Sequence, residues 1–322
     1  MIEIKESSIA DKEWNKRLIE SGFGTIYQSK EQGEHHIRQG RIPIYLQFFN
    51  EQQIVGQLLV GTVSRFRQNN LKSNFLKKIP TLKKISCYWT YGPIVFDKNF
   101  NNEIYFALAN YLKEKKFVAS GWQNPLCSYE ITNSNINFTT KPWSTFIINL
   151  TQSKEEISSL IDKHSGIKNI QRSIKRGVEV EQINDQNFIE YAKLRILESN
   201  QMITDSELEN KMNWWKSVKK LGYSGFLAIK DKKSIGGILF SSFGGHIIEV
   251  GIARSKDDKI NHLFSQDLLK WKIIEWGIEN KMSYYNLAGF NPHPESVKEK
   301  GIFRYKRKWG GKRYDFWRLF FK

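Results

Sequence analysis

The chain has 322 residues, more than one ordinary hydrophobic core holds, and this length predicts about two domains. Aromatic residues form 14% of the sequence and cysteine occurs only twice, which excludes a disordered chain, a disulfide scaffold, a zinc ribbon and an iron–sulfur site. The 50 Lys and Arg outnumber the 33 Asp and Glu, giving a net charge of +17, so the surface attracts nucleic acid, phosphorylated substrates or anionic membrane.

The first 140 residues predict a mixed α/β unit. Helical spacing of apolar residues indicates helices, and runs of β-branched and aromatic residues indicate strands. In chain order we expect a helix at 13–21, a hairpin of strands 42–50 and 53–65, a strand at 85–96 and a helix at 103–115. The strand at 85–96 is interrupted by Gly92-Pro93, and Ser29 is expected to cap a further helix.

The second half begins near Trp143 with a strand at 144–150. A capping box of Ser153 and Glu156 predicts a helix, and an isoleucine stripe predicts another that ends at Gly177. Further helices are expected at 187–199, 205–221 and 262–280, and strands at 224–229, 234–243, 246–254 and 283–287.

The order of a hairpin, a further strand and a helix occurs in both halves, which indicates two copies of one α/β unit. The polar run Asn133-Ser134-Asn135 and Pro142 place the boundary near 133–143. The N-terminus has no signal-peptide pattern, and no apolar run reaches the roughly 18 residues of a membrane span. We therefore expect a cytoplasmic protein, with peripheral contact at the inner face of the membrane left open.

Several catalytic motifs are absent from the sequence. No two histidines have a zinc-binding spacing, and no P-loop, no G-x-S-x-G elbow and no G-x-G-x-x-G turn after a strand occurs. An enzyme with so few reactive groups would act on an already activated donor, because positioning and oxyanion stabilisation then supply most of the rate.

The C-terminal stretch is strongly basic and rich in aromatic residues. From Ser296 to Lys322 there are ten Lys and Arg against two acids, and Phe303, Tyr305 and Trp309 are interleaved with them. Alternation of this kind predicts an extended strand, in which the aromatic residues point one way and Arg304 and Lys306 the other. Two interpretations stay open: a cationic strand that faces an anionic ligand, or an ordinary amphipathic strand with a solvated basic face.

Two further stretches carry charged or strained residues. Lys168, Arg172 and either Lys175 or Arg176 lie on one face of the predicted isoleucine-rich helix, either to bind phosphate or to complement the helix dipole. The strand interruption beside Tyr91 is either a bulge that opens a cleft or a simple edge break, and Asp97 is either functional or a turn residue.

These stretches together resemble the Fem-type (FemABX) aminoacyltransferases of peptidoglycan bridges and the wider Fem-like transferases of GNAT-type fold. Gln28-Ser29 is similar to the family's N-terminal QS element, and Tyr91-Gly92-Pro93-Ile94-Val95 to its RGP-V strand. Residues 172–180 resemble its basic helix end, residues 268–289 its long helix and Y-D strand, and residues 303–311 its FK-x-x-FGG element. The sequence departs from the family at Gln32, His36, Tyr91, Asn286 and Tyr305.

The resemblance implies an α/β fold of two tandem GNAT-like subdomains with mixed sheets flanked by helices, at residues 1–140 and 141–322. It implies an enzyme that moves an aminoacyl group from aminoacyl-tRNA to an amine on a peptidoglycan-type envelope precursor, without a cofactor or a metal. It places Lys306 near the transferred carbonyl, where a fixed ammonium stabilises the oxyanion or the leaving hydroxyl. It places substrate-binding groups at Tyr305, Arg172, Tyr91, Asp97 and Arg304.

Two alternatives belong to other classes. The first is an acyl-CoA-dependent N-acyltransferase of the same fold, which ordinarily cradles pyrophosphate in a glycine-rich turn before the long helix. Residues 254–260 hold that position here and contain no glycine, so backbone amides could not easily approach a pyrophosphate. The second is a non-catalytic RNA-binding protein, since fold alone does not prove activity.

Overall fold

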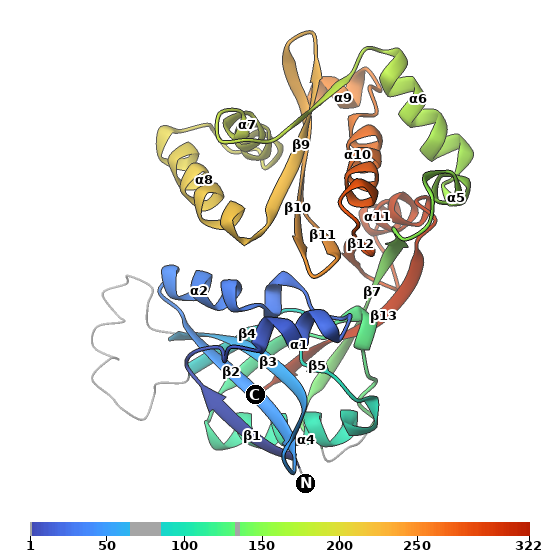
Figure 1. The fold of residues 1–322 in the computed structure, drawn as a ribbon. Helices are drawn as coiled ribbons and strands as arrows, with labels where there is room; N and C mark the ends of the chain where they lie inside the picture. Colours follow the sequence, from blue (N-terminus) through green and yellow to red (C-terminus); the bar gives the residue numbers. More distant parts are fainter. Residues whose placement is uncertain (1, 65–84, 133–135) are drawn as a thin grey trace. The chain divides into compact units, whose positions relative to one another are not determined.

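The structure, a computed structural model, describes residues 2–64, 85–132 and 136–322, and it falls into two compact units (Figure 1). The first unit comprises Met1–Ser144 and Tyr314–Lys322, and the second comprises Thr145–Arg313. The sequence places the division at residue 140, but the last strand returns to the first unit. The polar run at residues 133–135 lies outside the described residues.

The first unit is a mixed sheet with helices on both faces. Its helices and strands are β1 (Ile2–Ser7), α1 (Trp14–Glu20), η1 (Ile26–Gln28), α2 (Lys30–Arg38), β2 (Ile42–Asn50), β3 (Gln53–Ser64), β4 (Ile85–Trp89), β5 (Ile94–Val95), η3 (Lys98–Phe100), α4 (Asn101–Glu114), β6 (Val118–Trp122), η4 (Pro125–Cys127) and the terminal β13 (Lys312–Phe321). The strand order is β1-β2-β3-β4-β6-β13, with β5 beside β3. Only β4 and β6 pair in parallel among these strands.

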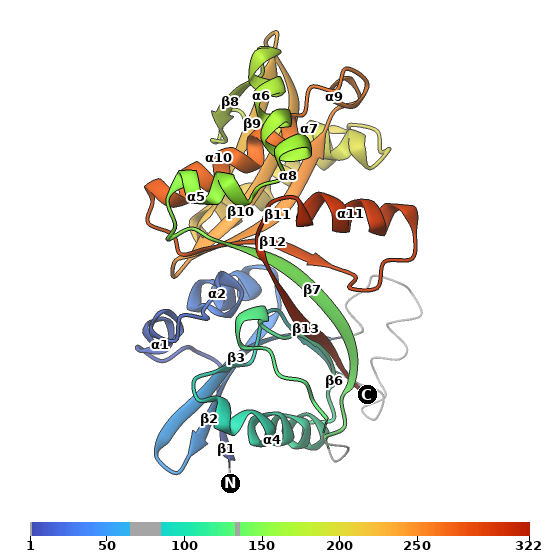
Figure 2. The same ribbon diagram turned by 90° about the vertical axis from the view of Figure 1, so that its right-hand side faces the viewer.

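Alternation along β2 explains the two helical layers of this unit. Tyr45 meets the ring of Trp14 on α1, with centroids 4.9 Å apart, whereas its neighbour Leu46 faces the other way into the core that α4 covers (Figure 2). Leu319 and Phe321 of β13 are buried in the same core. The C-terminal residues are therefore part of the first unit's interior.

The second unit repeats this plan. Its elements are β7 (Thr139–Asn149), α5 (Lys154–Leu160), η5 (Lys163–Ile167), α6 (Lys168–Lys175), β8 (Glu179–Gln182), α7 (Phe188–Glu198), α8 (Asp205–Val218), η6 (Lys219–Leu221), β9 (Tyr223–Lys230), β10 (Lys233–Phe243), β11 (His246–Arg254), α9 (Lys256–Ile260), α10 (Ser265–Glu279), β12 (Tyr284–Phe290) and α11 (Val297–Arg307). The strand order is β7-β12-β11-β10-β9-β8. Strands β8 to β11 are antiparallel, and α10 crosses to β12, which pairs in parallel with β11.

Each unit therefore contains a hairpin, a further strand and a helix, as the sequence pattern predicts, and in each the helix leads to a parallel strand. In the first unit α4 precedes β6, and in the second α10 precedes β12. The predicted hairpins form, and Gly244 and Gly245 supply the positive φ that the turn of β10 and β11 needs. Among the described residues, no helix has the length and apolar character of a membrane span.

One predicted element is wrong. The alternation of aromatic and basic residues predicts a strand at residues 303–307, but these residues form the last turns of α11. A capping box of Ser296 and Glu299 starts this helix, and Gly310, at φ +72°, follows its end. The strand begins only at Lys312. The helix changes which side chains share a face, and this decides where Arg304 and Lys306 point.

Candidate active site

Lys306 lies on the inner face of α11 in the second unit, where its residue is 9% exposed. Its ammonium donates three hydrogen bonds to backbone oxygens: Leu287 at 2.6 Å, Ala288 at 2.9 Å and Gly289 at 3.1 Å. Three consecutive carbonyls can serve one ammonium because Ala288, at φ +61°, interrupts the extended conformation within β12. The ammonium is thus held in a fixed place.

Asn286 holds this turn in shape. Its side-chain oxygen accepts the backbone N–H of Ala288 at 2.9 Å and the hydroxyl of Thr145 at 2.6 Å. Asn286 stands where the resembled family has an aspartate, and here the amide supports the backbone that binds Lys306. Its contribution to the site is therefore to position carbonyls.

Burial lowers the pKa of Lys306 to about 8, with the nearby Glu249 carboxylate opposing that effect and Lys270 reinforcing it. Three carbonyl oxygens favour the charged form, but none carries a full negative charge to offset the lost water. Lys306 is therefore a buried cation that loses its proton closer to neutral pH than an ordinary lysine.

A second buried lysine lies close by. Lys270 of α10 is fully buried and pairs with Glu249 of β11, which also accepts the Tyr285 hydroxyl at 2.9 Å. The Lys270 ammonium is 5.5 Å from the ring centroid of Tyr305 and 5.8 Å from that of Trp309. This pair is neutral overall and is enclosed by aromatic rings.

A third lysine connects the cluster to α6. Lys308 pairs with Asp267 at 2.5 Å and donates to the Ser165 carbonyl at 2.8 Å. The other oxygen of Asp267 accepts the Asn169 amide at 3.0 Å, and Arg172 donates to Asn169 at 3.0 Å. Burial lowers the pKa of Lys308, and Asp267 works against that shift. Arg172 is therefore joined to the cluster through Asn169.

The buried cluster, as we call it, consists of Lys306, Lys270, Lys308, Glu249 and Asp267. It holds three lysines and two carboxylates, and each carboxylate pairs with one lysine other than Lys306. Lys306 is thus the cation of the cluster without an acidic partner among the described residues. A buried excess positive charge can stabilise negative charge that develops on a bound substrate.

The structure brings three of the predicted site residues together. Lys306 belongs to the buried cluster, and Arg172 is joined to it through Asn169. The centroid of the Tyr305 ring lies 4.4 Å from the Lys308 ammonium. Burial raises the pKa of Tyr305, and the charges of Asp267 and Glu249 add to that effect. Tyr305 is therefore a neutral phenol inside the cluster.

The other three predicted residues lie elsewhere. The predicted strand would place Arg304 and Lys306 on the same face. Because these residues lie in a helix instead, Arg304 is exposed on a different face from Lys306. Tyr91 is buried in the first unit at φ +55°, between the rings of Tyr27 and Phe316. Asp97, also in the first unit, accepts the Asn99 N–H at 2.9 Å and begins a short helical turn.

Sequence analysis did not identify Glu249, Lys270, Asp267 or Lys308. A signal existed for two of them: Lys270 follows Leu268-Leu269 in the apolar helix, and Glu249 interrupts an apolar strand. A charged residue inside such a run is either solvated at an edge or paired in the interior. One sequence does not distinguish these cases, because the partner lies 21 residues away.

The first unit has a small polar cavity of about 190 Å³. His36 and Tyr88 line it, with the His36 Nδ1 3.1 Å from the Tyr88 hydroxyl, and Ser29 caps α2 as predicted. Burial lowers the pKa of His36 to about 4, with Arg41 adding to the shift, so its imidazole is neutral at neutral pH.

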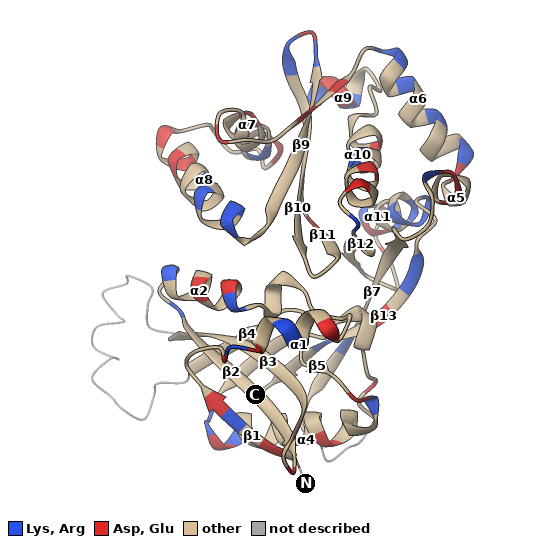
Figure 3. Cartoon of the chain, in the orientation of Figure 1, with Lys and Arg blue, Asp and Glu red and all other residues tan. Residues whose placement is uncertain are grey.

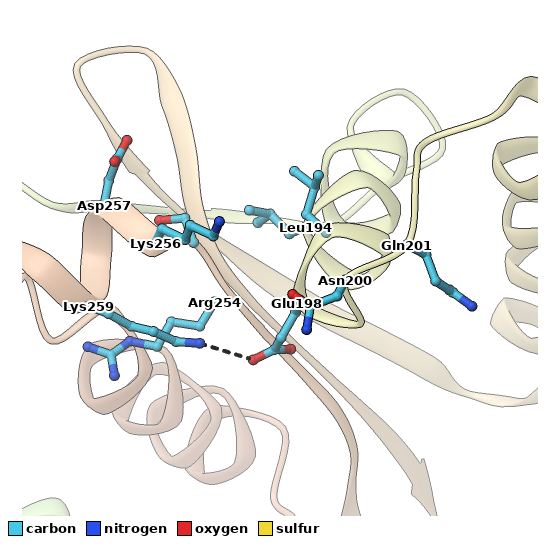
Figure 4. Close-up of a pocket in the computed structure, with 10 residues that line it drawn as sticks. Leu194, Glu198, Asn200, Gln201, Arg254, Lys256, Asp257 and Lys259 are labelled. Carbon is cyan, nitrogen blue, oxygen red and sulfur yellow. Dashed lines mark ion pairs between the residues drawn. The ribbon is translucent and has the colours of Figure 1, made fainter.

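A larger cavity of about 560 Å³ lies between the end of α7 and α9 in the second unit (Figure 4). Two of its cations are paired: Lys259 lies 3.9 Å from Glu198, and Arg254 pairs with the fully buried Asp258. Asp258 also accepts the backbone N–H of Ser265 at 3.0 Å. The start of α10 is therefore already occupied by a carboxylate.

Among the described residues no group of three or more His, Cys, Asp and Glu has a metal-binding arrangement. No family model matches the sequence, and no curated protein matches it. Solved structures do match. FemX aligns over 99% of this chain and 97% of its own, with a TM-score of 0.71 and 13% identity.

Two other structures align over almost the whole chain. A tandem GNAT protein from the clavulanic acid biosynthesis pathway covers 99% of this chain and 98% of its own, with a TM-score of 0.58 and 7% identity. L-PGS from Bacillus licheniformis covers 98% and 93%, with a TM-score of 0.53 and 10% identity. At these identities the likeness is one of fold, and it confirms the predicted tandem GNAT-like architecture and its resemblance to the Fem-type fold.

Proposed function

We propose that the protein is a transferase that moves an aminoacyl group from aminoacyl-tRNA to an amine on a peptidoglycan-type envelope precursor. The observation that carries the proposal is the fixed ammonium of Lys306, which has no acidic partner among the described residues, in a chain that has the fold of FemX. The basic composition supports an RNA donor, because a net charge of +17 attracts a polyanion.

The chemistry requires little beyond position and charge. The acceptor amine attacks the ester carbonyl of the aminoacyl donor, a C–N bond forms, and the C–O bond to the tRNA 3′-oxygen breaks. The amine loses one proton and the leaving 3′-oxygen gains one, so no oxidant or reductant is needed. The negative charge on the carbonyl oxygen in the transition state is where a buried ammonium contributes most.

Lys306 must exchange one of its hydrogen bonds to reach that oxygen. An ammonium has three hydrogens, and each is directed at a backbone carbonyl. The bond to Gly289 is the longest of the three at 3.1 Å, so we propose that this bond is exchanged for the substrate oxygen. The two remaining bonds then keep the ammonium in place.

The remaining predicted residues keep substrate-binding roles in the proposal. Arg172 lies at the edge of the buried cluster, and Tyr305 lies inside it. In these positions the two residues can hold the donor near Lys306. Tyr91 and Asp97 stay proposed contacts for the acceptor in the first unit. The Tyr91 ring packs against Tyr27, and Asp97 accepts the backbone N–H of Asn99. Both contacts are compatible with that proposal.

An acyl-CoA donor is disfavoured by the start of α10. The Ser265 N–H, which a pyrophosphate would need, already bonds to Asp258, and this carboxylate would repel a second anion. Residues 254–260 also lack the glycine that lets a pyrophosphate approach the backbone.

The test is a transfer assay with a radiolabelled aminoacyl-tRNA pool and envelope precursors that carry a free amine. We expect label in the precursor fraction, and none when the amine is first acetylated. A parallel reaction receives labelled acyl-CoA in place of the tRNA. Transfer from the thioester alone would replace the proposal with the acyl-CoA alternative, and RNA binding without any transfer would replace it with a non-catalytic RNA-binding protein.

A further inference from the structure

The outer face of α11 carries three cations in a row. Lys300, Arg304 and Arg307 are spaced i, i+4 and i+7, which places them on one side of the helix, and all three are exposed. We call these three residues the α11 stripe. None of them makes an ion pair or a side-chain hydrogen bond within the described part of the chain.

We infer that the α11 stripe is a docking surface for the phosphate backbone of an RNA strand. Seven residues of helix span about 10 Å, and one nucleic-acid strand carries a charge about every 3.4 Å of its axis, so three cations match about three phosphates. Two of the three are arginines, whose planar guanidinium binds phosphate through paired hydrogen bonds.

The helix dipole does not account for this arrangement. Cations favour the last turn of a helix, which explains Arg304 and Arg307. Lys300 lies only three residues after the first helical residue, where the dipole disfavours a positive charge. The acid of that turn, Glu299, is committed to the capping box with Ser296.

The stripe continues towards a second cationic helix in the same unit. Lys308, next to the stripe, donates to the Ser165 carbonyl just before α6, whose exposed face carries Lys168, Arg172 and Lys175. Figure 3 shows the basic residues of both helices. Two members of the buried cluster lie at this junction: Lys308, which follows α11, pairs with Asp267, and Asp267 accepts a hydrogen bond from Asn169 of α6. An RNA strand that follows the two helices would therefore cross the edge of the buried cluster.

Charge and composition favour RNA over a membrane as the occupant. A membrane-binding helix presents bulky apolar side chains beside its cations. Val297, which is 85% exposed, is the single fully exposed apolar residue at helical spacing from the stripe among the described residues, whereas Phe303 packs against Phe146 and Phe290. The choice of RNA as the occupant rests on the proposed function. The cationic surface itself does not depend on it.

The test compares three proteins by fluorescence anisotropy with unfractionated, uncharged tRNA over a series of salt concentrations. The first is the wild type, and the second is Lys300→Gln/Arg304→Gln/Arg307→Gln. The third, Lys211→Gln/Lys216→Gln/Lys220→Gln, removes the same charge from exposed positions in and beside α8. Thermal unfolding checks that all three are folded.

We expect the stripe variant to bind tRNA on the order of tenfold more weakly at the lowest salt, with a log–log salt slope less steep by about 2 to 3. The α8 variant should keep a slope close to that of the wild type. Equal slopes for the two variants would overturn the inference. An Arg304→Lys/Arg307→Lys variant, which keeps the charge, should retain most of the slope.

Sedimentation with lipid vesicles distinguishes RNA from an anionic membrane as the occupant of the α11 stripe. If the stripe variant loses sedimentation with phosphatidylglycerol vesicles but keeps the tRNA slope, the surface binds membrane and the inference is wrong. The measurement uses uncharged tRNA and needs no transfer. A wild type that transfers nothing but shows the slope difference would therefore retain the docking surface and lose the proposed function.

Discussion

At the scale of single residues, the interior of the second unit holds an unequal set of charges. Glu249 and Asp267 each neutralise one lysine, and Lys306 depends on carbonyl dipoles instead. Dipoles hold the ammonium in place without cancelling its charge. This distinguishes Lys306 from Lys270, which is fully buried but neutralised by its partner.

This difference predicts a pH dependence of stability. The pKa of Lys306 is about 8 in the folded protein and has an ordinary value of 10.5. Between these values the unfolded chain binds more protons, so the free energy of unfolding rises with pH. From about pH 8 to about pH 10 the wild type should gain about 2 kcal/mol relative to Lys306→Met. Urea unfolding of both proteins across this range measures it, and parallel curves would contradict the assigned pKa.

Lys270 predicts a different outcome. Lys270→Met leaves the Glu249 carboxylate buried without a cation, which should cost about 3 kcal/mol or more of unfolding free energy. Lys270→Met/Glu249→Gln removes both charges and should recover a large part of that loss. Chemical unfolding of the two single variants and the double variant gives the coupling. Additive effects would show that the two residues act independently.

Only part of this site could be predicted from the sequence. Lys306 and Arg172 were identified through their resemblance to family motifs, whereas Lys270 and Glu249 were not. Their pairing depends on how α10 lies against β11, which is set by packing of the whole unit. The three carbonyl hydrogen bonds of Lys306 depend on the positive φ of Ala288, and alanine as a residue type does not predict a positive φ.

At the scale of elements, α11 shows how two local signals compete. Alternating aromatic and basic residues at 303–306 have the period of a strand, while Ser296 and Glu299 have the spacing of a helix start. The helix forms, so Lys306 and Arg304 belong to different faces. Helix α6 and the β10–β11 hairpin were easier to predict, because Gly177 marks the end of the helix and Gly244 and Gly245 mark the turn of the hairpin.

The capping box of α11 predicts a measurable loss. Ser296→Ala removes the hydroxyl that accepts the Glu299 N–H, which should cost about 1 kcal/mol of unfolding free energy. Because Lys306 lies in the same helix, the Ser296→Ala protein should lose more transfer activity than the Ser153→Ala protein, which lacks the equivalent cap of α5. Equal activity in the two variants would show that the α11 cap does not position Lys306.

The Asp258 cap of α10 gives a second element-scale prediction. Asp258→Asn keeps the size of the side chain but weakens its pairing with Arg254, so we expect a destabilisation of about 2 kcal/mol. If Asp258 also excludes acyl-CoA, the variant should gain a thermal shift with coenzyme A that the wild type lacks. A wild type that is itself stabilised by coenzyme A would contradict the account of this helix start.

At the scale of the whole molecule, the chain order and the folded units do not coincide. The last nine residues of the sequence belong to the first unit, although the preceding residues belong to the second. The sequence showed the repeated α/β plan but not this return, because β13 contributes Leu319 and Phe321 to a core formed mostly before residue 140.

Deleting residues 314–322 should therefore destabilise the distant half of the sequence. Three buried side chains, Phe316, Leu319 and Phe321, would be lost, on the order of 5 kcal/mol of burial in total. We expect hydrogen exchange to accelerate in β2 and β3 and to stay slow in β10 and β11. Deletion of Lys322 alone is the control, and unchanged protection of β2 and β3 would contradict this division.

The most direct measurement of the central claim is single-turnover transfer by Lys306→Met, with Lys298→Met on the exposed surface of the same helix as the control. Loss of a charge that stabilises the oxyanion should slow transfer by about 100-fold or more while leaving tRNA binding intact. Lys298→Met should transfer at the wild-type rate. A folded Lys306→Met protein that transfers as fast as its control would contradict the account.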